Sequence, residues 1–421
     1  MSDDQGQQRR DARQRPETND TGRRVTGARR VAAPRPDLTG FGRLRTLFLL
    51  AGASGSAFIP FFAPLLKHWG FDPQQIGLII AAGALASGAT MPLWSHLADT
   101  RLGAIRVLVV SSLLTAGLAL VLALTPRAFW PVLVVAGLMY VCAGPGAPLS
   151  DALAVAYLGE ERMSEYGRIR LWASLGWGVA VIAFGALYQG VGLGPVLPLY
   201  AAGTLVFAFW ALRLPPGAPV PVRAESRLGA FGDVFRASPR LAPFVVGMFI
   251  VSVGVYGAIS FVSVRIIDTG GGPLLVGVAA GFAALIEIPV MHWSGGLARR
   301  FGLRSVFVAG ALVYALVFLT WTAIGSPLVL SLVATGDGVA FALVYVGTVV
   351  IIGRLVPRRL LATGQSVSQT FGWTLGAIVG PSIGGFVFAR LGAPALFGGA
   401  GALCVAGAIM VWFVLAGTEH A

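Results

Sequence analysis

Four ionisable side chains stand inside apolar stretches of this chain, and they are its first candidates for chemistry. Arg170 belongs to EYGRIRLWASLGWG (residues 165–178), a stretch that begins charged and continues apolar and rich in glycine. Asp151, Glu287 and Asp337 are likewise flanked by apolar residues. An ionised side chain at the centre of a lipid bilayer costs at least about 2.5 kcal/mol. Each of the four is therefore expected to have a partner or a task.

Asp151 and Arg170 are expected to form an ion pair. Asp151 lies near the end of one predicted helix (129–158), and Arg170 lies near the start of the next (166–190). At 1.5 Å per residue, the acid is about 10 Å and the base about 6 Å from the same end of these antiparallel helices. The two side chains can therefore meet.

The helix face that carries Arg170 offers groups suited to binding a polar substrate. Arg170, Ser174 and Trp177 follow the spacing i, i+4, i+7, which puts them on one face. They present a planar guanidinium group, a hydroxyl group and an aromatic ring. We expect Arg170 to balance Asp151 and to hold a polar or anionic substrate group. The alternative is an ion pair that only stabilises the fold, and Arg168 is expected to be an anchor at the membrane surface.

Glu287 and Asp337 are candidates for carrying a proton. Glu287 stands in AALIEIPV close to Pro289, which loosens a helix locally. An apolar environment disfavours the ionised form of a carboxyl group, and this suits a group that loads and releases a proton near neutral pH. Asp337 lies between two glycines in ATGDGVAF and is a candidate for proton coupling or substrate binding. For both acids the alternative is a structural role between packed helices, and His292 is expected at the membrane interface.

The composition indicates the class of protein that must position these groups. The 421 residues are 56% hydrophobic and only 12% charged, whereas charged residues make up about a quarter of a soluble protein. The 57 glycines suit membrane helices that approach each other closely. We therefore predict an all-α protein that crosses a membrane many times.

Several other classes of protein are not expected. The net charge of +13 does not indicate nucleic-acid binding, because the basic residues gather in an N-terminal arm and in short loops. Cys142 and Cys404 both lie in apolar spans, so no disulfide is expected. The sequence shows no nucleophile–base pair, metal-ligand cluster or phosphate-binding loop. We expect neither an enzyme nor a cofactor; the expected partners are the bilayer, protons and a small-molecule substrate.

Twelve apolar runs are long enough to cross a bilayer, which takes about 20 residues of helix. They are approximately 43–67, 74–97, 104–125, 129–158, 166–190, 194–213, 241–267, 273–295, 303–324, 327–353, 361–389 and 393–416. The longest loop, 214–240, is proline-rich and then amphipathic, and is expected to be a cytoplasmic linker between two six-helix bundles (41–213 and 241–417). Residues 1–40 have no apolar period and are expected to form a disordered, arginine-rich cytoplasmic arm.

The basic residues fix the expected orientation. Alternate loops hold Arg101, Arg106, Arg162, Arg223, Arg227, Arg236, Arg240, Arg299, Arg300, Arg304, Arg354, Arg358 and Arg359. The other loops offer only Lys67, Arg127, Arg265 and Arg390. Arginine-rich loops stay in the cytoplasm, so we predict a protein of the cytoplasmic (inner) membrane with both termini in the cytoplasm.

Basic, glycine-centred turns repeat in the two halves. LADTRLGAIR (97–106) follows the second span and LARRFGLR (297–304) follows the eighth, and LGW (175–177) recurs as FGW (371–373). Offsets of about 200 residues between matching positions indicate a duplicated six-helix unit, as in transporters with parallel repeats.

Several stretches resemble the major facilitator superfamily. SHLADTRLGAIR resembles its signature loop between helices 2 and 3, with Asp99, Gly103 and Arg106 in place as the loop that controls conformation. Four stretches resemble one branch of that superfamily, which contains lactose permease and the phenylpropionate and nucleoside proton symporters. They are residues 58–99, GAPLSDALAVAYL (146–158), EYGRIRLWASLGWG (165–178) and AALIEIPVMHWSGGLARRFG (283–302).

The resemblance implies alternating access, in which two six-helix bundles rock about a central site and a proton is commonly co-transported. It assigns substrate binding to Asp151, Arg170 and Trp177. With ligands expected from both halves, the full substrate-binding set is Asp151, Arg170, Ser174, Trp177, Tyr256, Gln369 and Trp373, and the proton-coupling set is Glu287 and Asp337. The chain departs from lactose permease around Tyr256, where no acid follows, and at Asp337, where relatives often carry histidine. The proton relay of that permease therefore does not carry over.

Two functions remain open at this point. Proton-coupled uptake of a small polar or aromatic solute is favoured by Asp151, Arg170, Trp177 and Glu287. Proton-driven export of amphipathic compounds is favoured by the apolar helices and by GAIVGPSIGG (376–385), which resembles an antiporter motif but stands in the other half, where helix packing explains it better. In either case the chain is expected to be a monomer.

Overall fold

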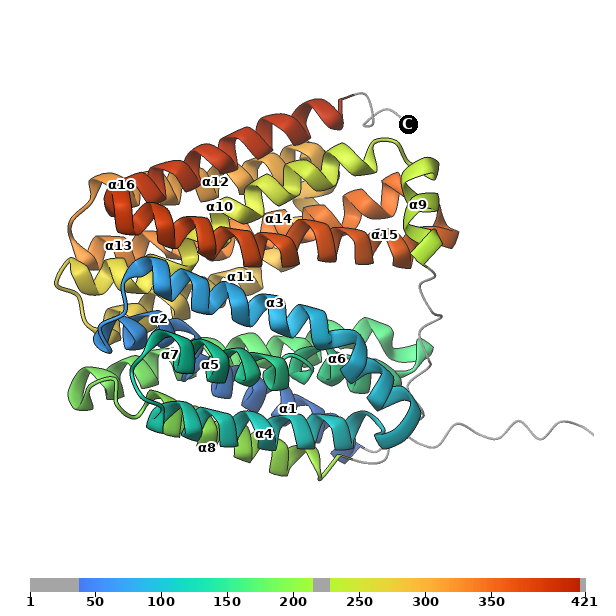
Figure 1. Ribbon diagram of the computed structural model, residues 1–421. Coiled ribbons are helices and arrows are strands. Elements are labelled where there is room, and N and C mark those ends of the chain that lie inside the picture. Colours follow the sequence, from blue (N-terminus) through green and yellow to red (C-terminus); the bar gives the residue numbers. More distant parts are fainter. Residues whose placement is uncertain (1–37, 215–227, 417–421) are drawn as a thin grey trace, which may run out of the picture. The chain divides into compact units, whose positions relative to one another are not determined.

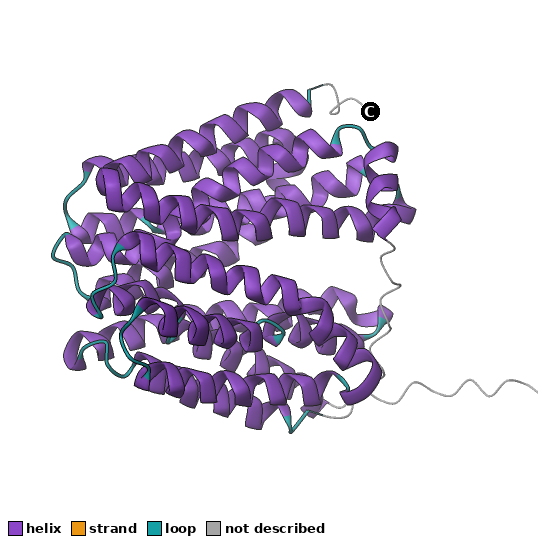
Figure 2. Cartoon of the chain, in the orientation of Figure 1, coloured by secondary structure: helices purple, strands orange, loops and turns teal. Residues whose placement is uncertain are grey.

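Residues 38–214 and 228–416 are described by the computed structural model, and they form helices joined by turns, without strands (Figure 2). Residues 1–37 of the predicted arm (1–40) lie outside the described residues, whereas residues 38–40 belong to the first helix. Residues 215–227 of the predicted linker and residue 417 of the predicted second bundle also lie outside them.

The first half contains eight α-helices within residues 38–214. They are α1 (Leu38–Ser56), α2 (Ile59–His68), α3 (Pro73–Leu97), α4 (Ala104–Leu124), α5 (Phe129–Ala143), α6 (Gly146–Leu158), α7 (Tyr166–Val191) and α8 (Val196–Ala211). Pro60 and Pro145 stand where the first and fourth crossings are interrupted, because proline has no backbone N–H to continue a helix.

The second half begins with a short helix that lies within the predicted linker. Its α-helices are α9 (Leu228–Ala237), α10 (Leu241–Asp268), α11 (Pro273–Phe301), α12 (Leu303–Ala323), α13 (Pro327–Val333), α14 (Thr335–Leu355), α15 (Leu361–Val367) and α16 (Leu375–Val414). A π-helical turn, Ser368–Thr374, joins α15 to α16.

The number of crossings agrees with the sequence. Ten helical segments of the described chain are long and apolar enough to cross a membrane. One of them, Thr363–Val414, has 52 residues and turns back at Gly392, where φ is 83° (Figure 1). It therefore makes two crossings, and the shorter apolar helix α8 makes another. The twelve predicted crossings are thus present.

The two halves form two helical bundles that lie side by side. In Figure 1 the helices α1–α8 (blue to green) lie together, and α10–α16 (yellow to red) lie together next to them. Because successive crossings alternate in direction, the turns fall at two ends. The end with the turns at Gly103, Gly159 and Gly302 also carries α9 and is called the α9 end; the turns at Gly70 and Gly270 lie at the far end.

Local sequence explains how the helices start. Asp72 caps α3: its Oδ1 accepts a hydrogen bond from the backbone N–H of Gln75 at 2.9 Å, and Gln75 Oε1 accepts one from the backbone N–H of Asp72 at 3.2 Å. Gly103 and Gly302 precede α4 and α12 with φ of 79° and 82°, a conformation that favours glycine. The predicted tight turns in the two halves are therefore confirmed.

The most extensive contacts between the bundles are two helix crossings, α3 with α16 and α7 with α11. Glycines make both crossings close. A Cβ added to Gly77 of α3 would overlap the carbonyl oxygen of Pro381, and one added to Gly185 of α7 would lie 2.7 Å from the carbonyl oxygen of Pro273. Backbones can approach this closely only where side chains are absent.

Two polar contacts also join the bundles, both at the far end. Lys67 at the end of α2 pairs with Asp268 at the end of α10. Gln189 Oε1 of α7 accepts a hydrogen bond from the backbone N–H of Leu274 at 3.4 Å. These contacts and the glycine crossings close the far end of the interface between the bundles.

The apolar core consists of two clusters of buried residues. One large cluster of buried residues runs through both bundles, and a smaller cluster around Leu47, Ala154 and Ile169 lies in the first bundle toward the α9 end. Exposed leucine, valine and phenylalanine side chains cover much of the remaining helix surface, as expected of helices that face lipid.

Candidate functional site

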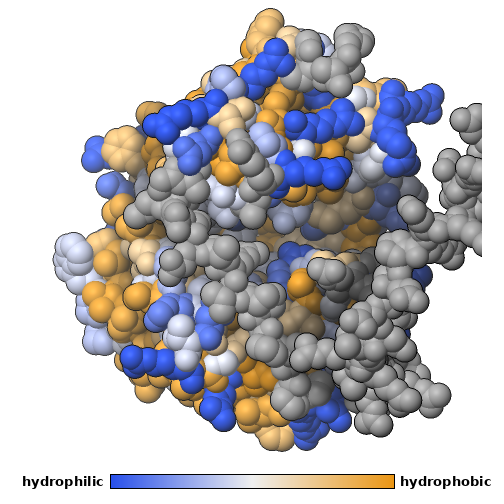
Figure 3. Space-filling model, turned by 90° about the vertical axis from the view of Figure 1, so that its right-hand side faces the viewer, coloured by the Kyte–Doolittle hydropathy of each residue, from blue (hydrophilic) through white to orange (hydrophobic). Residues whose placement is uncertain are grey.

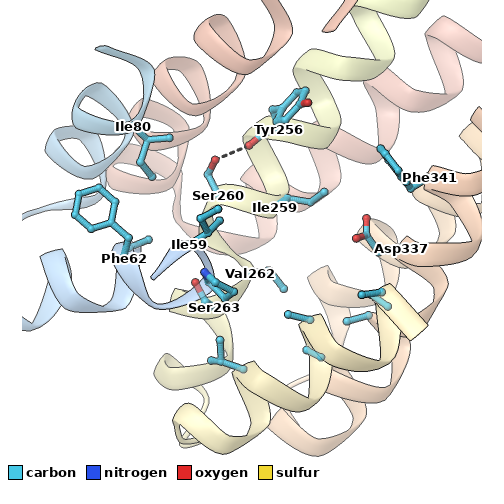
Figure 4. Close-up of a pocket in the computed structure, with 18 of the residues that line it drawn as sticks. Ile59, Phe62, Ile80, Tyr256, Ile259, Ser260, Val262, Ser263, Asp337 and Phe341 are labelled. Atoms are coloured by element: carbon cyan, nitrogen blue, oxygen red, sulfur yellow. Dashed lines mark hydrogen bonds between the residues drawn. The ribbon is translucent and has the colours of Figure 1, made fainter. Parts of the chain in front are cut away.

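A cavity of about 410 Å³ lies between the two bundles. Helices α2, α3, α5 and α7 line it from the first bundle, and α10, α11, α12, α14 and α16 line it from the second. Figure 4 shows Phe62 and Ile80 on one side and Tyr256, Asp337 and Phe341 on the other. A pocket of this size suits a small organic molecule.

Two acids, Glu287 of α11 and Asp337 of α14, line the cavity. Both are half-buried. Their helices pack tightly, because a Cβ added to Gly338 would overlap the carbonyl oxygen of Ala283, which lies one turn before Glu287. The glycine that follows Asp337 thus brings α14 against α11, and both carboxyl groups reach the same cavity.

Asp337 has an unusual environment for a carboxyl group. Its Oδ1 is buried and has no hydrogen-bond partner among the described residues. Leaving a buried polar atom unpaired costs about 1–3 kcal/mol. A proton or a polar ligand group at this position would remove that cost, so the geometry fits a site that binds something.

Trp177 of α7 reaches the cavity because α1 has glycines beside it. A Cβ added to Gly55 would lie 3.2 Å from the Trp177 ring, and one added to Gly52 would overlap the carbonyl oxygen of Ala173. These two glycines let α7 pack against α1 and leave room for the indole ring. Trp177 is half-buried and forms part of the cavity wall.

Aromatic rings support the opposite wall. The Tyr256 and Phe341 side chains line the cavity, and both contact Trp373, with ring centroids 6.2 Å from that of Trp373 in each pair. Trp373 is only 5% exposed and lies behind them. Ser260 donates a hydrogen bond to the backbone carbonyl of Tyr256 at 2.8 Å (Figure 4).

The predicted ion pair between α6 and α7 is present. Arg170 Nη1 lies 2.8 Å from Oδ1 and 2.8 Å from Oδ2 of Asp151, and Tyr166 Oη is 3.5 Å from the same nitrogen. The Arg170 and Asp151 side chains are 51% and 32% exposed. A single nitrogen therefore serves both carboxylate oxygens, and the rest of the guanidinium group is accessible.

The pair lies outside the cavity lining. Arg170 stands two helical turns before Trp177 on α7, about 10 Å along the helix toward the α9 end. Both side chains are open to solvent at that level.

The structure divides the predicted site residues into two groups. Trp177, Tyr256, Glu287 and Asp337 line the cavity. The residues outside its lining are Asp151, Arg170, Ser174, Gln369 and Trp373. Of these, Ser174 is half-buried and Gln369 is exposed in the π-helical turn. The cavity lining therefore includes fewer residues of α6, α7 and the π-helical turn than predicted.

Several lining residues were not predicted from the sequence. The aromatic members of this group are Phe62, Tyr140, Trp321 and Phe341. Phe341 lies one helical turn after Asp337. This spacing was the only feature of the sequence that could have indicated that Phe341 lines the cavity. The others stand in apolar runs, where a ring that faces the cavity looks the same as one that faces lipid.

The conformational loop motif lies at the α9 end. Asp99 belongs to a π-helical turn, Ala98–Leu102, and Gly103 follows it with positive φ. Asp99, Gly103 and Arg106 are all exposed. The geometry of the turn agrees with the motif, and the role of its charges stays a prediction.

The cavity lining is mainly apolar and aromatic. Within residues 38–214 and 228–416, no group of three His, Cys, Asp or Glu side chains could hold a metal ion. The two carboxyl groups are the ionisable acids among the lining residues.

Comparison with known proteins agrees with this architecture. The family model described as the MFS_1 like family matches residues 41–398. Maltose permease of Geobacillus stearothermophilus is 27% identical over 380 residues, which cover 89% of this chain and 93% of the permease. The multidrug resistance protein MdtG of Erwinia billingiae is 26% identical over 396 residues, which cover 87% of this chain and 91% of that protein. The crystal structure of the nucleoside transporter NupG has a TM-score of 0.78 at 15% identity and covers 90% of this chain and 100% of that chain, which shows the same fold.

Proposed function

Because this chain belongs to the MFS_1 like family of major facilitator superfamily transporters, we propose that it carries a small organic solute through its central cavity together with protons. The observation that carries the proposal is the position of Glu287 and Asp337 in one cavity between the bundles. Each acid can be ionised or neutral, and a cavity that opens to each side in turn would move protons with the solute.

The lining of the cavity favours a solute with a flat or apolar body. Aromatic rings from Phe62, Tyr140, Trp177, Tyr256, Trp321 and Phe341 surround it, and such rings bind planar or apolar surfaces. Arginine and lysine are absent from the lining residues described. A polar or anionic group of the solute therefore finds no arginine or lysine inside the cavity, and Arg170 binds such a group on the way to the α9 end.

The α9 end is proposed to face the cytoplasm. The turns at this end carry arginine in both halves, among them Arg101, Arg106, Arg299 and Arg304, and arginine-rich loops stay in the cytoplasm. This orientation puts both termini there and leaves the cavity closed toward the outside by the glycine crossings. The protein would then lie in the inner membrane.

Uptake into proteoliposomes tests the proposal. With an inward proton gradient, we expect wild-type protein to accumulate a panel solute, the panel being maltose, uridine and phenylpropionate. Glu287→Gln should abolish accumulation driven by the gradient and retain exchange of labelled for unlabelled solute, because a neutral amide cannot release a proton. Asp233→Asn is the matched control: Asp233 lies on α9 and pairs with Arg236 at 3.2 Å, outside the cavity. A fully active Glu287→Gln variant would contradict the role of Glu287 in coupling.

A second candidate function is export of amphipathic compounds in exchange for protons. It is favoured by the apolar lining of the cavity and by the similarity to a multidrug resistance protein. The same vesicles separate the two functions. If an inward proton gradient drives an amphipathic dye out of the vesicles, and the panel solutes do not accumulate, the exporter is favoured.

A further inference from the structure

A second large cavity lies at the α9 end, entirely within the second bundle. Its volume is about 1080 Å³. Its lining residues come from the turn before α10, the α11–α12 turn and the ends of α14 and α16. They include Arg240, Arg299, Arg304 and Arg354 and no acid. We call this cavity the arginine pocket.

The positions of the pocket arginines on their helices are favourable for only two of the four. Arg299 and Arg354 stand in the last turns of α11 and α14, where a cation is favoured by the helix dipole. Arg240 is the N-cap of α10, and Arg304 is the second residue of α12. A cation at a helix N-terminus is disfavoured. The helix dipole therefore does not account for these two arginines.

The N-terminus of α12 in the pocket is open to an anion, whereas in α10 the Leu241 N–H already donates to the Ser238 carbonyl oxygen at 3.0 Å and Pro243 has no N–H. Neither α10 nor α12 has a hydrogen bond from a capping side chain. The first backbone N–H groups of each helix have no partner within the helix, and such groups bind phosphate readily. The open N-terminus of α12 and four guanidinium groups thus surround one cavity.

Arg304 is held in place for binding. Its guanidinium carbon lies 3.3 Å from the centroid of the Trp412 ring, and its Nε is buried without a hydrogen-bond partner among the described residues. Asp233, the acid nearest in sequence to Arg240, already pairs with Arg236. A guanidinium group held by stacking suits a planar contact with a phosphate through its terminal nitrogens.

The two halves differ at this position. The turn in the first half, LADTRLG, includes Asp99, whereas the corresponding turn in the second half, LARRFG, has no acid. Figure 3 looks onto this end and shows hydrophilic side chains gathered on the upper part of the face. The excess of positive charge belongs to the second half.

From these observations we propose that the arginine pocket is a binding site for a phosphoryl-bearing polyanion on the α9 face. Two sources share this chemistry: the headgroup of an anionic phospholipid and a soluble phosphate ester. Because the pocket is built from one bundle, its occupant would bind without entering the transport cavity. The proposal does not depend on the solute or on proton coupling.

Binding to the full-length protein in neutral detergent, after removal of lipid, tests the proposal. The probes are inorganic pyrophosphate and cardiolipin in mixed micelles, each compared with sodium chloride of equal ionic strength. We expect one or both to raise the unfolding midpoint in a saturable manner. A response to pyrophosphate identifies a soluble phosphate site, and a response to cardiolipin alone identifies a lipid site.

Variants distinguish a built site from general surface charge. Arg240→Gln and Arg304→Gln should each weaken binding of the effective probe about tenfold or more, and Arg304→Lys should not restore it, because lysine lacks the planar fork. Arg300→Gln removes the same charge from a residue outside the pocket lining and should change affinity less than about twofold by comparison. Since Arg240 is exposed, its variant is expected to fold even if loss of Arg304 disturbs Trp412. No saturable shift with either probe, or an equal loss in Arg300→Gln, would overturn the proposal.

Discussion

Arg170 shows how a charged residue is tolerated in a membrane helix. Its Nη1 bonds both oxygens of Asp151 at 2.8 Å, and its side chain is half exposed. The charge is thus neither isolated nor removed from water, which are the two conditions that make intramembrane arginine costly. The remaining guanidinium nitrogens are left for a second partner, and we assign them to the solute as it passes.

This assignment predicts a specific defect in Arg170→Lys. A lysine ammonium can keep a contact with Asp151, but its donors share one nitrogen and cannot also reach the solute as the spread, planar guanidinium fork can, so we expect KM for the accumulated panel solute to rise about tenfold. The unfolding midpoint should stay close to that of the wild type. Arg168→Lys, the same change two residues earlier, should leave KM unchanged. If Arg170→Lys transports with wild-type KM, Arg170 does not contact the solute.

Single residues also show what the sequence could and could not reveal. The Asp151–Arg170 pair was predictable because both charges had to lie at one level of adjacent antiparallel helices. Glu287 and Asp337 were identifiable because acids are rare in apolar spans. Phe62, Tyr140 and Trp321 were not, since lipid and a cavity lined by aromatic rings accept the same apolar side chains. Ser174 and Gln369 lie outside the cavity lining. Their positions were not predictable, because the sequence alone does not show which neighbouring helix or cavity a helix face contacts.

At the scale of elements, the far end of the interface is closed mainly by backbone contacts. Gly77 and Gly185 put α3 against α16 and α7 against α11. Gly277 of α11 and Gly385 of α16 contribute to the same two crossings from the second bundle. Gly277 follows Gly77 by 200 residues, and Gly385 follows Gly185 by 200 residues, as expected for a duplicated unit. The Lys67–Asp268 pair is partly exposed, and pairs of this kind contribute about 0–1 kcal/mol. The glycines therefore dominate closure.

We predict that Gly77→Val opens the far end. The valine side chain would overlap the backbone at Pro381, and such overpacking costs about 1–3 kcal/mol, enough to shift a balanced equilibrium toward the open state. Spin labels at Trp130 and Leu328, which are 70% and 54% exposed near the far ends of the two bundles, would report a longer distance by double electron–electron resonance. Gly117→Val is the control, because nothing lies within 4 Å of a Cβ at Gly117. An unchanged distance in Gly77→Val, or an equal change in the control, would show that the crossing does not hold the end closed.

For the whole molecule, the hydropathy pattern and the positions of arginine were sufficient to predict twelve crossings in two related halves. The fold is predictable at this level because the bilayer dictates the length of each helix and the need to satisfy its backbone internally. The conformation was not predictable. Closure at one end depends on contacts between residues about 300 positions apart, such as Gly77 with Pro381, and these arise only once both bundles are folded.

The central claim is that the cavity between the bundles opens to each side of the membrane in turn. Ser263 lines this cavity and is buried, and the native cysteines, Cys142 and Cys404, are buried as well. The most direct measurement is therefore the reaction of a Ser263→Cys variant with a membrane-impermeant maleimide, applied to one face at a time in oriented vesicles. The account predicts reaction from both faces, faster from the α9 side, and protection by an accumulated solute. Reaction from one face only, with or without solute, would contradict it.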